Sequence, residues 1–300
     1  MDGRAEIPAR PLYARPAYAA AFGFGAIDVV PWGTAILTRA IPLTNWSDAL
    51  GCYPLTVFGP RPDLPAGLEQ LRTEGLVSVA LVPDPLTSPA PETLASAFEV
   101  CRPFKTHYLI DREAGPVHFT KNHRWSVRKS LQYCSFEQID FGAHLVLWQR
   151  LYQHTVARHE VTGLQDFAPA YFQELAKMPE VTALAAKYQD EIVAIILWVR
   201  NGDIVYAHLE GGSPAALQTH ATYGLIAAAN EHFADCRIIH LGGAAGLRAE
   251  SGDGLAHFKR GFANREVTAY FCGSSLRPDR YAALAGAQPQ TSFFPAYRKP

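Results

Sequence analysis

The clearest pattern of hydrophobic and polar positions lies in the second half of the chain. Three consecutive segments, Val181–Tyr188, Ile192–Arg200 and Ile204–Glu210, have the apolar content and the short length of β-strands. The Asn201–Gly202 pair between the last two is typical of a type I′ hairpin turn, in which both turn positions need positive φ. The pattern therefore predicts three antiparallel neighbours.

Segments with other regular spacings precede and follow these strands. Before them, the sequence predicts a helix over about 117–131 and a second helix whose apolar face is formed by Leu145, Trp148, Leu151, Tyr152 and Val156. After them come a helix with Leu217, Ala221, Leu225 and Ala228 on one face, a strand over 237–241, a Gly-rich loop to Gly254, a short helix through Lys259 and a strand over 266–272. The predicted order is helix, helix, three strands, helix, strand, helix, strand.

Shorter elements, interrupted by prolines, are predicted in the first hundred residues. Strands are expected over 27–30, 35–37 and 77–82, and helices near 68–73 and 92–100. Because prolines become rarer after Pro103, we expect a boundary between about 103 and 117, and divide the chain into residues 1–110 and 111–300. The last stretch of roughly 25 residues is free in this division to pack back on the first half.

Composition places the chain among globular proteins of two domains. Its 300 residues are 48% hydrophobic and 18% charged, and 27 Lys and Arg against 28 Asp and Glu give a net charge of −1. Contact with a polyanion would therefore use a local patch. The longest apolar run, Ile192–Val199, is far shorter than the roughly 20 residues of a membrane-spanning helix. With no apolar signal region at the N-terminus, we expect a cytoplasmic protein.

The cysteines and the common catalytic motifs exclude several classes of site. Five widely spaced cysteines with no CxxC pair indicate reduced thiols and no structural zinc: Cys52, Cys101, Cys134, Cys236 and Cys272. The sequence contains neither HExxH nor the P-loop pattern GxxxxGK[ST]. We therefore expect no metal.

Four short motifs occur in order along the second half. They are KNHRWSVRKSL at 121–131, YQHTVAR at 152–158, HLGG at 240–243 and DGLAHFKRGF at 253–262. Together they resemble the Fem family of the GNAT superfamily, non-ribosomal peptidyltransferases that move an amino acid from aminoacyl-tRNA onto an amine. The resemblance covers roughly residues 104–272. It implies an α/β fold of two GNAT-like halves, with mixed central sheets flanked by helices. In the second half, the strands before and after the central helix splay apart to form the acyl-donor cleft.

The resemblance also assigns the residue expected to stabilise the transition state. In the Phe258–Lys259 pair it places the lysine beside the reacting carbonyl, where a cation offsets the negative charge of the tetrahedral intermediate. Phe258 is carried over as its catalytic neighbour. The alternative is that Lys259 and Arg260 only complement the C-terminal dipole of a short helix capped by Asp253.

A second candidate group consists of His208, Glu210 and His240. His208 and Glu210 are two residues apart and are expected to share one strand face, while His240 ends the strand across the splay. Any of the three is a candidate base if the attacking amine arrives protonated. The alternative is a buried histidine that only satisfies backbone groups.

Three further residues are candidates for binding substrate. Arg158 resembles the family's arginine that holds the acceptor's anionic group, and its alternative is an ordinary cation at a helix end. Tyr152 belongs to the same motif. Tyr223, in the predicted central helix, is the third.

A run of basic residues is the basis of a further prediction, and the resemblance favours its contact with phosphates. Lys121, Arg124 and Arg128 stand at i, i+3 and i+7, so a helix aligns them in one stripe, with Lys129 beside them. Residues 114–136 contain no Asp or Glu, so these charges repel one another unless an anionic partner is present. The alternative is a solvated helix face.

The donor is expected to be aminoacyl-tRNA. CoA-dependent GNAT enzymes carry [QR]xxGx[GA] before the central helix to cradle the pyrophosphate, and residues 218–224 do not fit that spacing. The resemblance, together with this missing motif, thus implies an aminoacyltransferase without a cofactor. Its acceptor would be the free amine of a small peptide, from a nucleotide-linked cell-wall precursor or a peptide antibiotic. Two alternatives stay open: a CoA-dependent N-acyltransferase of the same fold, and a non-catalytic protein that binds tRNA or the precursor.

Overall fold

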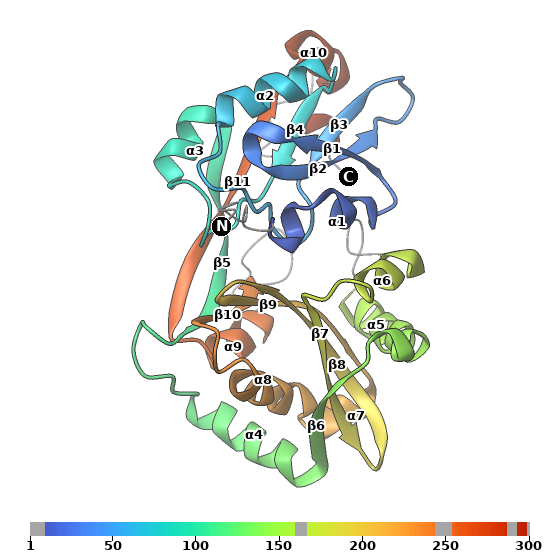
Figure 1. Cartoon of the computed structure of the whole chain (residues 1–300), viewed down its shortest axis with the longest axis vertical. Helices are drawn as coiled ribbons and strands as arrows, with labels where there is room; N and C mark the ends of the chain where they lie inside the picture. Colours follow the sequence, from blue (N-terminus) through green and yellow to red (C-terminus); the bar gives the residue numbers. More distant parts are fainter. Residues whose placement is uncertain (1–9, 160–166, 244–253, 287–292, 299–300) are drawn as a thin grey trace, which may run out of the picture. The chain divides into compact units, whose positions relative to one another are not determined.

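The computed structural model describes residues 10–159, 167–243, 254–286 and 293–298. By its internal contacts the chain divides into two compact units (Figure 1). Residues 1–104 together with 269–300 form the first unit, and residues 105–268 form the second.

Two long strands cross the boundary between the units. β5 (Val100–Asp111) and β11 (Arg265–Ser275) each begin in one unit and end in the other. The division falls at 104/105, within the expected window of about 103–117 and six residues before the division at 110/111, and Pro103 itself lies inside β5. A proline is tolerated in a strand where no ladder hydrogen bond needs its N–H.

The first unit is built on a mixed sheet with the strand order β1-β2-β3-β4-β11. β3 and β4 are parallel, and the other neighbours are antiparallel. Its core includes the fully buried indole of Trp32, which packs against Phe58 and Phe98. In chain order the elements besides β5 and β11 are η1 (Leu12–Ala14), α1 (Pro16–Ala20), β1 (Gly25–Val29), η2 (Val30–Trp32), β2 (Thr34–Ala40), β3 (Ser47–Leu50), α2 (Leu64–Thr73), β4 (Ser78–Leu81), α3 (Pro91–Ala97), α10 (Pro278–Ala285) and η5 (Ala296–Arg298).

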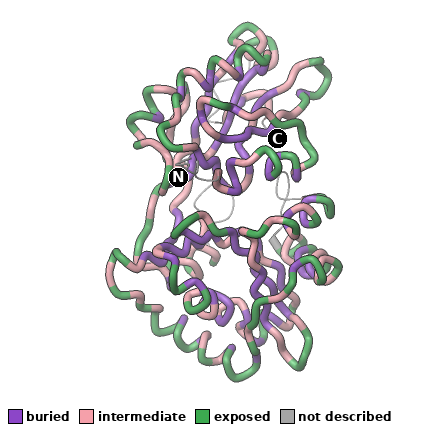
Figure 2. Tube along the Cα trace, in the orientation of Figure 1, coloured by how far each residue is buried: buried purple, intermediate pink, exposed green. Residues whose placement is uncertain are grey.

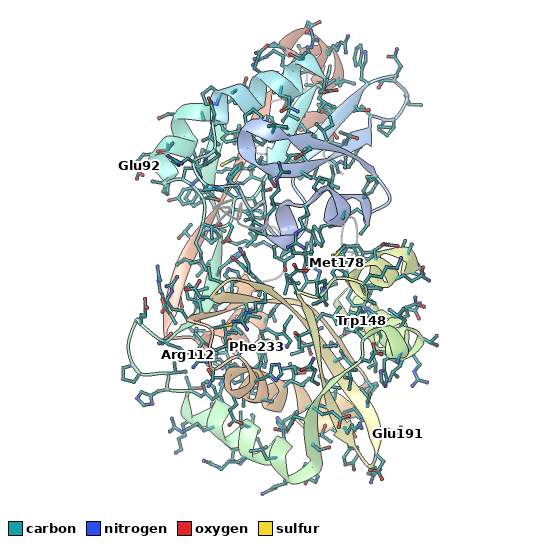
Figure 3. All side chains as sticks on the ribbon, viewed as in Figure 1. Glu92, Arg112, Trp148, Met178, Glu191 and Phe233 are labelled. Atoms are coloured by element: carbon teal, nitrogen blue, oxygen red, sulfur yellow. The ribbon has the colours of Figure 1, made fainter. Side chains whose placement is uncertain are left out.

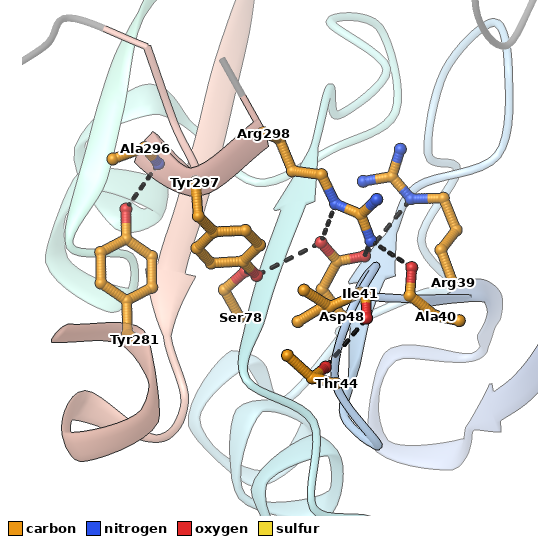
Figure 4. Close-up of polar contacts among 10 residues, drawn as sticks. All are labelled: Arg39, Ala40, Ile41, Thr44, Asp48, Ser78, Tyr281, Ala296, Tyr297 and Arg298. Carbon is orange, nitrogen blue, oxygen red and sulfur yellow. Dashed lines mark hydrogen bonds and ion pairs between the residues drawn. The ribbon is translucent and has the colours of Figure 1, made fainter. Parts of the chain in front are cut away.

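A buried carboxylate ties η5 to the sheet of the first unit (Figure 4). Asp48 of β3 is fully buried, and Arg298 donates to both of its oxygens, at 2.8 and 3.1 Å. Arg39 of β2 and the hydroxyl of Tyr297 donate to the same carboxylate. The buried charge is thus paired and hydrogen-bonded, as burial of a carboxylate requires.

The second unit has the strand order β5-β10-β9-β8-β7-β6, in which only β9 and β10 are parallel. In chain order its elements besides β5 and β11 are α4 (Lys121–Tyr133), β6 (Cys134–Ile139), η3 (Gly142–His144), α5 (Leu145–His159), α6 (Pro169–Leu175), β7 (Val181–Tyr188), β8 (Glu191–Asn201), β9 (Ile204–Gly212), α7 (Pro214–Gln218), α8 (Ala221–His232), β10 (Ile238–Gly243) and α9 (Gly254–Arg260). The predicted order of elements is therefore present, with β5, β6, η3 and α6 as unpredicted additions.

Helices cover both faces of this sheet. On one face, Ile196 and Val205 share a buried core with Leu225 of α8, and α4 packs against α8. On the opposite face α5 approaches β9 so closely that a Cβ on Gly211 would lie 2.9 Å from the backbone nitrogen of Tyr152. Figure 2 shows the buried positions gathered along the strands, and Figure 3 labels Trp148 of α5 and Phe233 at the end of α8.

Two local predictions in this unit are wrong. At the β8–β9 turn only Gly202 has positive φ; the adjacent positive-φ pair of a type I′ turn is instead Gln189–Asp190, between β7 and β8. The predicted central helix is two helices, α7 and α8, because His220 takes a left-handed φ of 55° between them. Leu217 of α7 is consequently 57% exposed instead of facing the core.

Candidate active site

The strands on either side of α7 and α8 separate after a short paired stretch. β9 and β10 pair through three positions, the last of which joins Tyr206 to His240. Beyond it β9 pairs with β8 alone, while β10 bends at a register shift in which Gly242 takes a φ of +78°. The two strands therefore splay at Tyr206 and His240, as the sequence analysis predicts.

Lys259 reaches the end of β10 from α9. Its Nζ donates a hydrogen bond of 2.6 Å to the carbonyl of Gly243, and lies 3.2 Å from the position that a Cβ on Gly242 would occupy. The side chain is partly buried. This hydrogen bond joins two residues that are sixteen positions apart along the chain. The HLGG motif and the catalytic candidate Lys259 therefore meet where the two strands splay.

Phe258 and Tyr223 contribute to the packing that holds α9 in place. Their rings meet edge to face at 4.8 Å, and Phe258 packs against the core of the unit. His123 of α4 was not predicted as a site residue, yet its Nε2 lies 2.8 Å from the carbonyl oxygen of Phe258. Since that oxygen can only accept, His123 donates through Nε2, and its Nδ1 accepts from the hydroxyl of Thr120 at 2.8 Å. This chain of contacts fixes the residue next to Lys259.

His240 is buried and paired with a second histidine. Its Nε2 lies 3.1 Å from Nδ1 of His107 on β5, and both rings are at least 94% buried. Burial holds the pKa of His107 well below its usual range, and the interactions with His240 and with the positive charges of Lys259 and Lys105 lower it further. His107 was not predicted as a site residue because the strand that carries it, β5, was not predicted, although the apolar run Tyr108–Ile110 is a signal for a strand.

His208 and Glu210 lie on opposite faces of β9, which corrects the expectation that they share one face. The pairing of β9 with β8 skips His208, since Ala207 and Leu209 pair with consecutive residues of β8. One extra residue of this kind is a β-bulge, and it reverses the alternation of side chains beyond it.

The two side chains consequently have different partners. Nε2 of His208 lies 2.8 Å from the hydroxyl of Tyr171 on α6, and burial lowers the pKa of His208 to about 3. Glu210 accepts a hydrogen bond of 2.7 Å from the hydroxyl of Thr222 on α8 and is partly exposed. Glu210 is therefore the more exposed of the two side chains.

The two candidates from the YQHTVAR motif stand in different surroundings. Tyr152 is 7% exposed, with its ring stacked on Trp148 at 5.5 Å and edge to face with Phe172. Arg158, near the end of α5, is exposed. The ring of Tyr152 is thus largely occupied by core contacts, and the substrate-binding roles of both residues stay predictions.

The basic residues of α4 form an exposed stripe, as predicted. Lys121, Arg124 and Arg128 are exposed, and Lys129 lies over the ring of Tyr133 at 4.9 Å. Arg124 donates to the carbonyl of Phe119, and none of the four forms an ion pair with the described residues. Their charges therefore remain uncompensated within that part of the chain.

Neither a metal cluster nor a membrane-spanning helix is found in the described parts of the chain. Across residues 10–159, 167–243, 254–286 and 293–298, no three His, Cys, Asp or Glu side chains come together as metal ligands. Over the same ranges no helix has the length and hydropathy needed to cross a bilayer.

Solved structures share this fold. No family model matches the sequence, and no curated protein is similar to it in sequence. The C-terminal domain of a putative lysylphosphatidylglycerol synthetase from Agrobacterium fabrum superposes with a TM-score of 0.63 at 16% identity, over 89% of this chain and 88% of that one. FemX gives 0.60 at 11% identity over 83% and 86%, and L-PGS from Bacillus licheniformis gives 0.57 at 12% over 90% and 94%. At such identities the likeness establishes the fold alone, and it confirms the predicted α/β class of mixed sheets flanked by helices.

Proposed function

We propose that this protein is an aminoacyltransferase that moves an amino acid from aminoacyl-tRNA to the free amine of a peptide acceptor, with formation of an amide. The observation that carries the proposal is the hydrogen bond of Lys259 Nζ to Gly243, at the end of the strand that splays from β9. A cation held there would stabilise charge that develops only in the transition state. The fold shared with FemX, with L-PGS and with the C-terminal domain of a putative lysylphosphatidylglycerol synthetase supports an acyl transfer.

The reaction needs little beyond positioning and charge stabilisation. The acceptor nitrogen attacks the ester carbonyl carbon of the aminoacyl-tRNA, the C–N bond forms, and the carbonyl electron pair moves to oxygen beside Lys259. The intermediate then collapses, the ester C–O bond breaks, and the ribose oxygen of the tRNA leaves with a proton from the ammonium. Because the ester is already activated, holding the two substrates together supplies much of the rate.

Glu210 is our candidate for the base that deprotonates the arriving amine. It is partly exposed, and its carboxylate can accept a proton while keeping one oxygen for Thr222. His208 is a poor base because its pKa is about 3 and its Nε2 is engaged with Tyr171. Both side chains belong to β9, and the bulge at His208 directs them to opposite faces of the sheet, where they meet different partners.

The stripe on α4 is proposed to hold phosphates of a substrate, either at the acceptor end of the tRNA or in a diphosphate of the acceptor. Replacing Arg124 and Arg128 by Gln in one variant should weaken binding of that ligand. The slope of log affinity against log salt concentration should also become shallower, by the amount that corresponds to roughly two phosphate contacts. The matched control is Lys177→Gln/Arg200→Gln, which removes two exposed cations of the same unit that pair with Glu174 and Asp235. If both double variants bind each ligand with the wild-type salt slope, the stripe is a solvated face.

A donor and acceptor screen tests the proposed function. The protein is incubated with a fully charged pool of tRNA and with three kinds of acceptor: peptides with a free N-terminal amine, a nucleotide-linked peptide, and phosphatidylglycerol. The products are identified by mass. An amide product supports the proposal, and an ester of phosphatidylglycerol changes the acceptor to a lipid hydroxyl. A rise in melting temperature with acetyl-CoA, together with acetylated product, favours the CoA-dependent alternative. Binding of tRNA with no product from any acceptor favours the non-catalytic alternative.

A further inference from the structure

His107 occupies a position that no sequence motif marks. It lies on β5, 6% exposed, with Nδ1 3.1 Å from His240 Nε2 and with the two rings at a centroid distance of 5.0 Å. The ring edge that carries Nε2 and Cδ2 faces Gly243, where a Cβ would lie 2.9 Å from Nε2 and 2.8 Å from Cδ2. Nε2 makes no hydrogen bond with the described residues. A nearly buried nitrogen therefore stands beside the glycine whose carbonyl holds Lys259.

The backbone fixes which nitrogen of each ring carries the proton. The N–H of Gly242 donates to Nδ1 of His240 at 3.2 Å, so that nitrogen is unprotonated. A neutral His240 then carries its proton on Nε2 and donates it to Nδ1 of His107. His107, in turn, has its proton on Nε2. We call this chain of hydrogen bonds, from Gly242 through His240 to His107, the histidine relay. It ends in the Nε2–H of His107, which is directed away from His240 and toward the Gly242–Gly243 end of β10.

The charges around His107 keep it neutral. Lys105 on the same strand, Lys259 on α9 and His240 on β10 all oppose a positive imidazole, and Tyr206 of β9 lies against the His240 ring at 5.1 Å without adding a negative charge. Burial acts in the same direction and is the largest cause. A neutral imidazole is a hydrogen-bond donor that gives up its proton reluctantly, which suits it to stabilise an oxyanion and not to act as an acid.

We propose that His107 is a catalytic residue that donates its Nε2–H to the same developing oxyanion as Lys259, and that His240 is the positioning residue that holds it in this tautomer. The inference rests on the proposed function and adds a second hydrogen-bond donor to it. It also removes His240 from the candidates for the base, since its Nε2 already carries a proton and its Nδ1 is occupied by Gly242.

Nitrogen-15 NMR of the histidine side chains tests the relay without any substrate. In the wild-type protein at pH 7, His107 should be neutral with Nε2 protonated and Nδ1 unprotonated, and it should stay so as the pH falls to 5.5. The variant His240→Gln keeps an N–H donor and should preserve this tautomer, whereas His240→Leu should give a mixture of tautomers. An imidazolium at His107, or a proton on its Nδ1 in the wild type, overturns the proposal.

Kinetics test the role in the reaction. His107→Leu should lower kcat by about 10²-fold or more while KM for the acceptor stays near the wild-type value, as removal of one oxyanion donor does. His107→Gln should recover part of the loss, because an amide N–H can replace the imidazole N–H. His144→Gln, a histidine on η3 that binds the carbonyl of Asp140, is the matched control and should be unaffected.

The outcomes separate this inference from the proposed function. Product formation at the wild-type rate by a folded His107→Leu variant overturns the role of His107 and leaves the aminoacyltransferase assignment standing. Absence of product with every aminoacyl-tRNA and acceptor overturns the assignment, and with it the oxyanion role. In that case the NMR experiment still decides whether His240 holds His107 in the tautomer with the proton on Nε2.

Discussion

Replacement of Lys259 by Met removes the ammonium group and keeps an unbranched apolar stem of similar length. In the structure Nζ is held 2.6 Å from the carbonyl of Gly243, so its place at the end of β10 is fixed before substrate arrives. Loss of one preorganised oxyanion donor lowers kcat by about 10²–10³-fold, or about 2.7–4 kcal/mol of transition-state stabilisation. We therefore expect kcat of Lys259→Met to fall by that factor, with KM for the acceptor nearly unchanged.

A structural role for Lys259 predicts a different result. The bond to Gly243 links α9 to β10, and a hydrogen bond from a charged group contributes about 1.5–3 kcal/mol to folding. If that link is its whole role, urea denaturation of Lys259→Met should show the loss, while kcat of the folded protein should stay at the wild-type value. A single-turnover assay, with enzyme in excess over charged tRNA and with saturating acceptor, measures the rate constant of the transfer step independently of the folded fraction.

Arg260→Met is the matched control for charge on the same helix. Arg260 is exposed, pairs with Glu266 at 3.0 Å and lies over the ring of Tyr108. If Lys259 only complemented the helix dipole, removal of either cation would have a similar effect. Equal losses of kcat in the two variants, or an unchanged kcat in Lys259→Met, would refute the oxyanion role.

Three further predictions concern stability. Asp48→Ala leaves Arg39 and Arg298 without their shared carboxylate and should lower the free energy of unfolding by about 3–5 kcal/mol; a loss below 1 kcal/mol in urea denaturation contradicts the buried pairing. Gly224→Ala would put a methyl group 2.1 Å from Cζ of Phe136 and should destabilise by about 1–3 kcal/mol, whereas Gly254→Ala meets open space and should not. His208 stays neutral in the folded state down to pH about 3, while the unfolded state protonates it below about 6.5, so stability should fall by about 1.4 kcal/mol per unit as pH drops through that window. Acid unfolding of His208→Gln should be less steep, and equal steepness would count against this cause.

Patterns that depend on neighbours along the chain predicted much of the second unit. The strand over Val181–Tyr188 has the predicted bounds, since its apolar run has the length of a strand and is closed by a polar turn. α5 and β8 also lie where the apolar spacing places them. β5 was not predicted because a proline near its start outweighed the apolar run Tyr108–Ile110, and the omission of β5 concealed His107.

Features that depend on pairing between strands could not be predicted in the same way. The sequence around His208 alternates without interruption, and only the register with β8 reveals the extra residue. A one-residue slip moves Glu210 to the opposite face, so the proposed grouping of His208 with Glu210 was bound to fail. The left-handed φ of His220 likewise cannot be predicted from the spacing of apolar residues.

Each position of the HLGG motif has a structural role at the end of β10. His240 orients His107, and Leu241 is buried in the core of the sheet. Gly242 takes a φ of +78°, which turns its N–H toward Nδ1 of His240 and which an L side chain rarely adopts. Gly243 leaves no room for a Cβ beside His107, and its carbonyl accepts from Lys259. The four positions together place two hydrogen-bond donors, Lys259 and His107, at the end of β10. The two glycines are required because one takes a positive φ and the other leaves no room for a side chain, and not because the strand must be flexible.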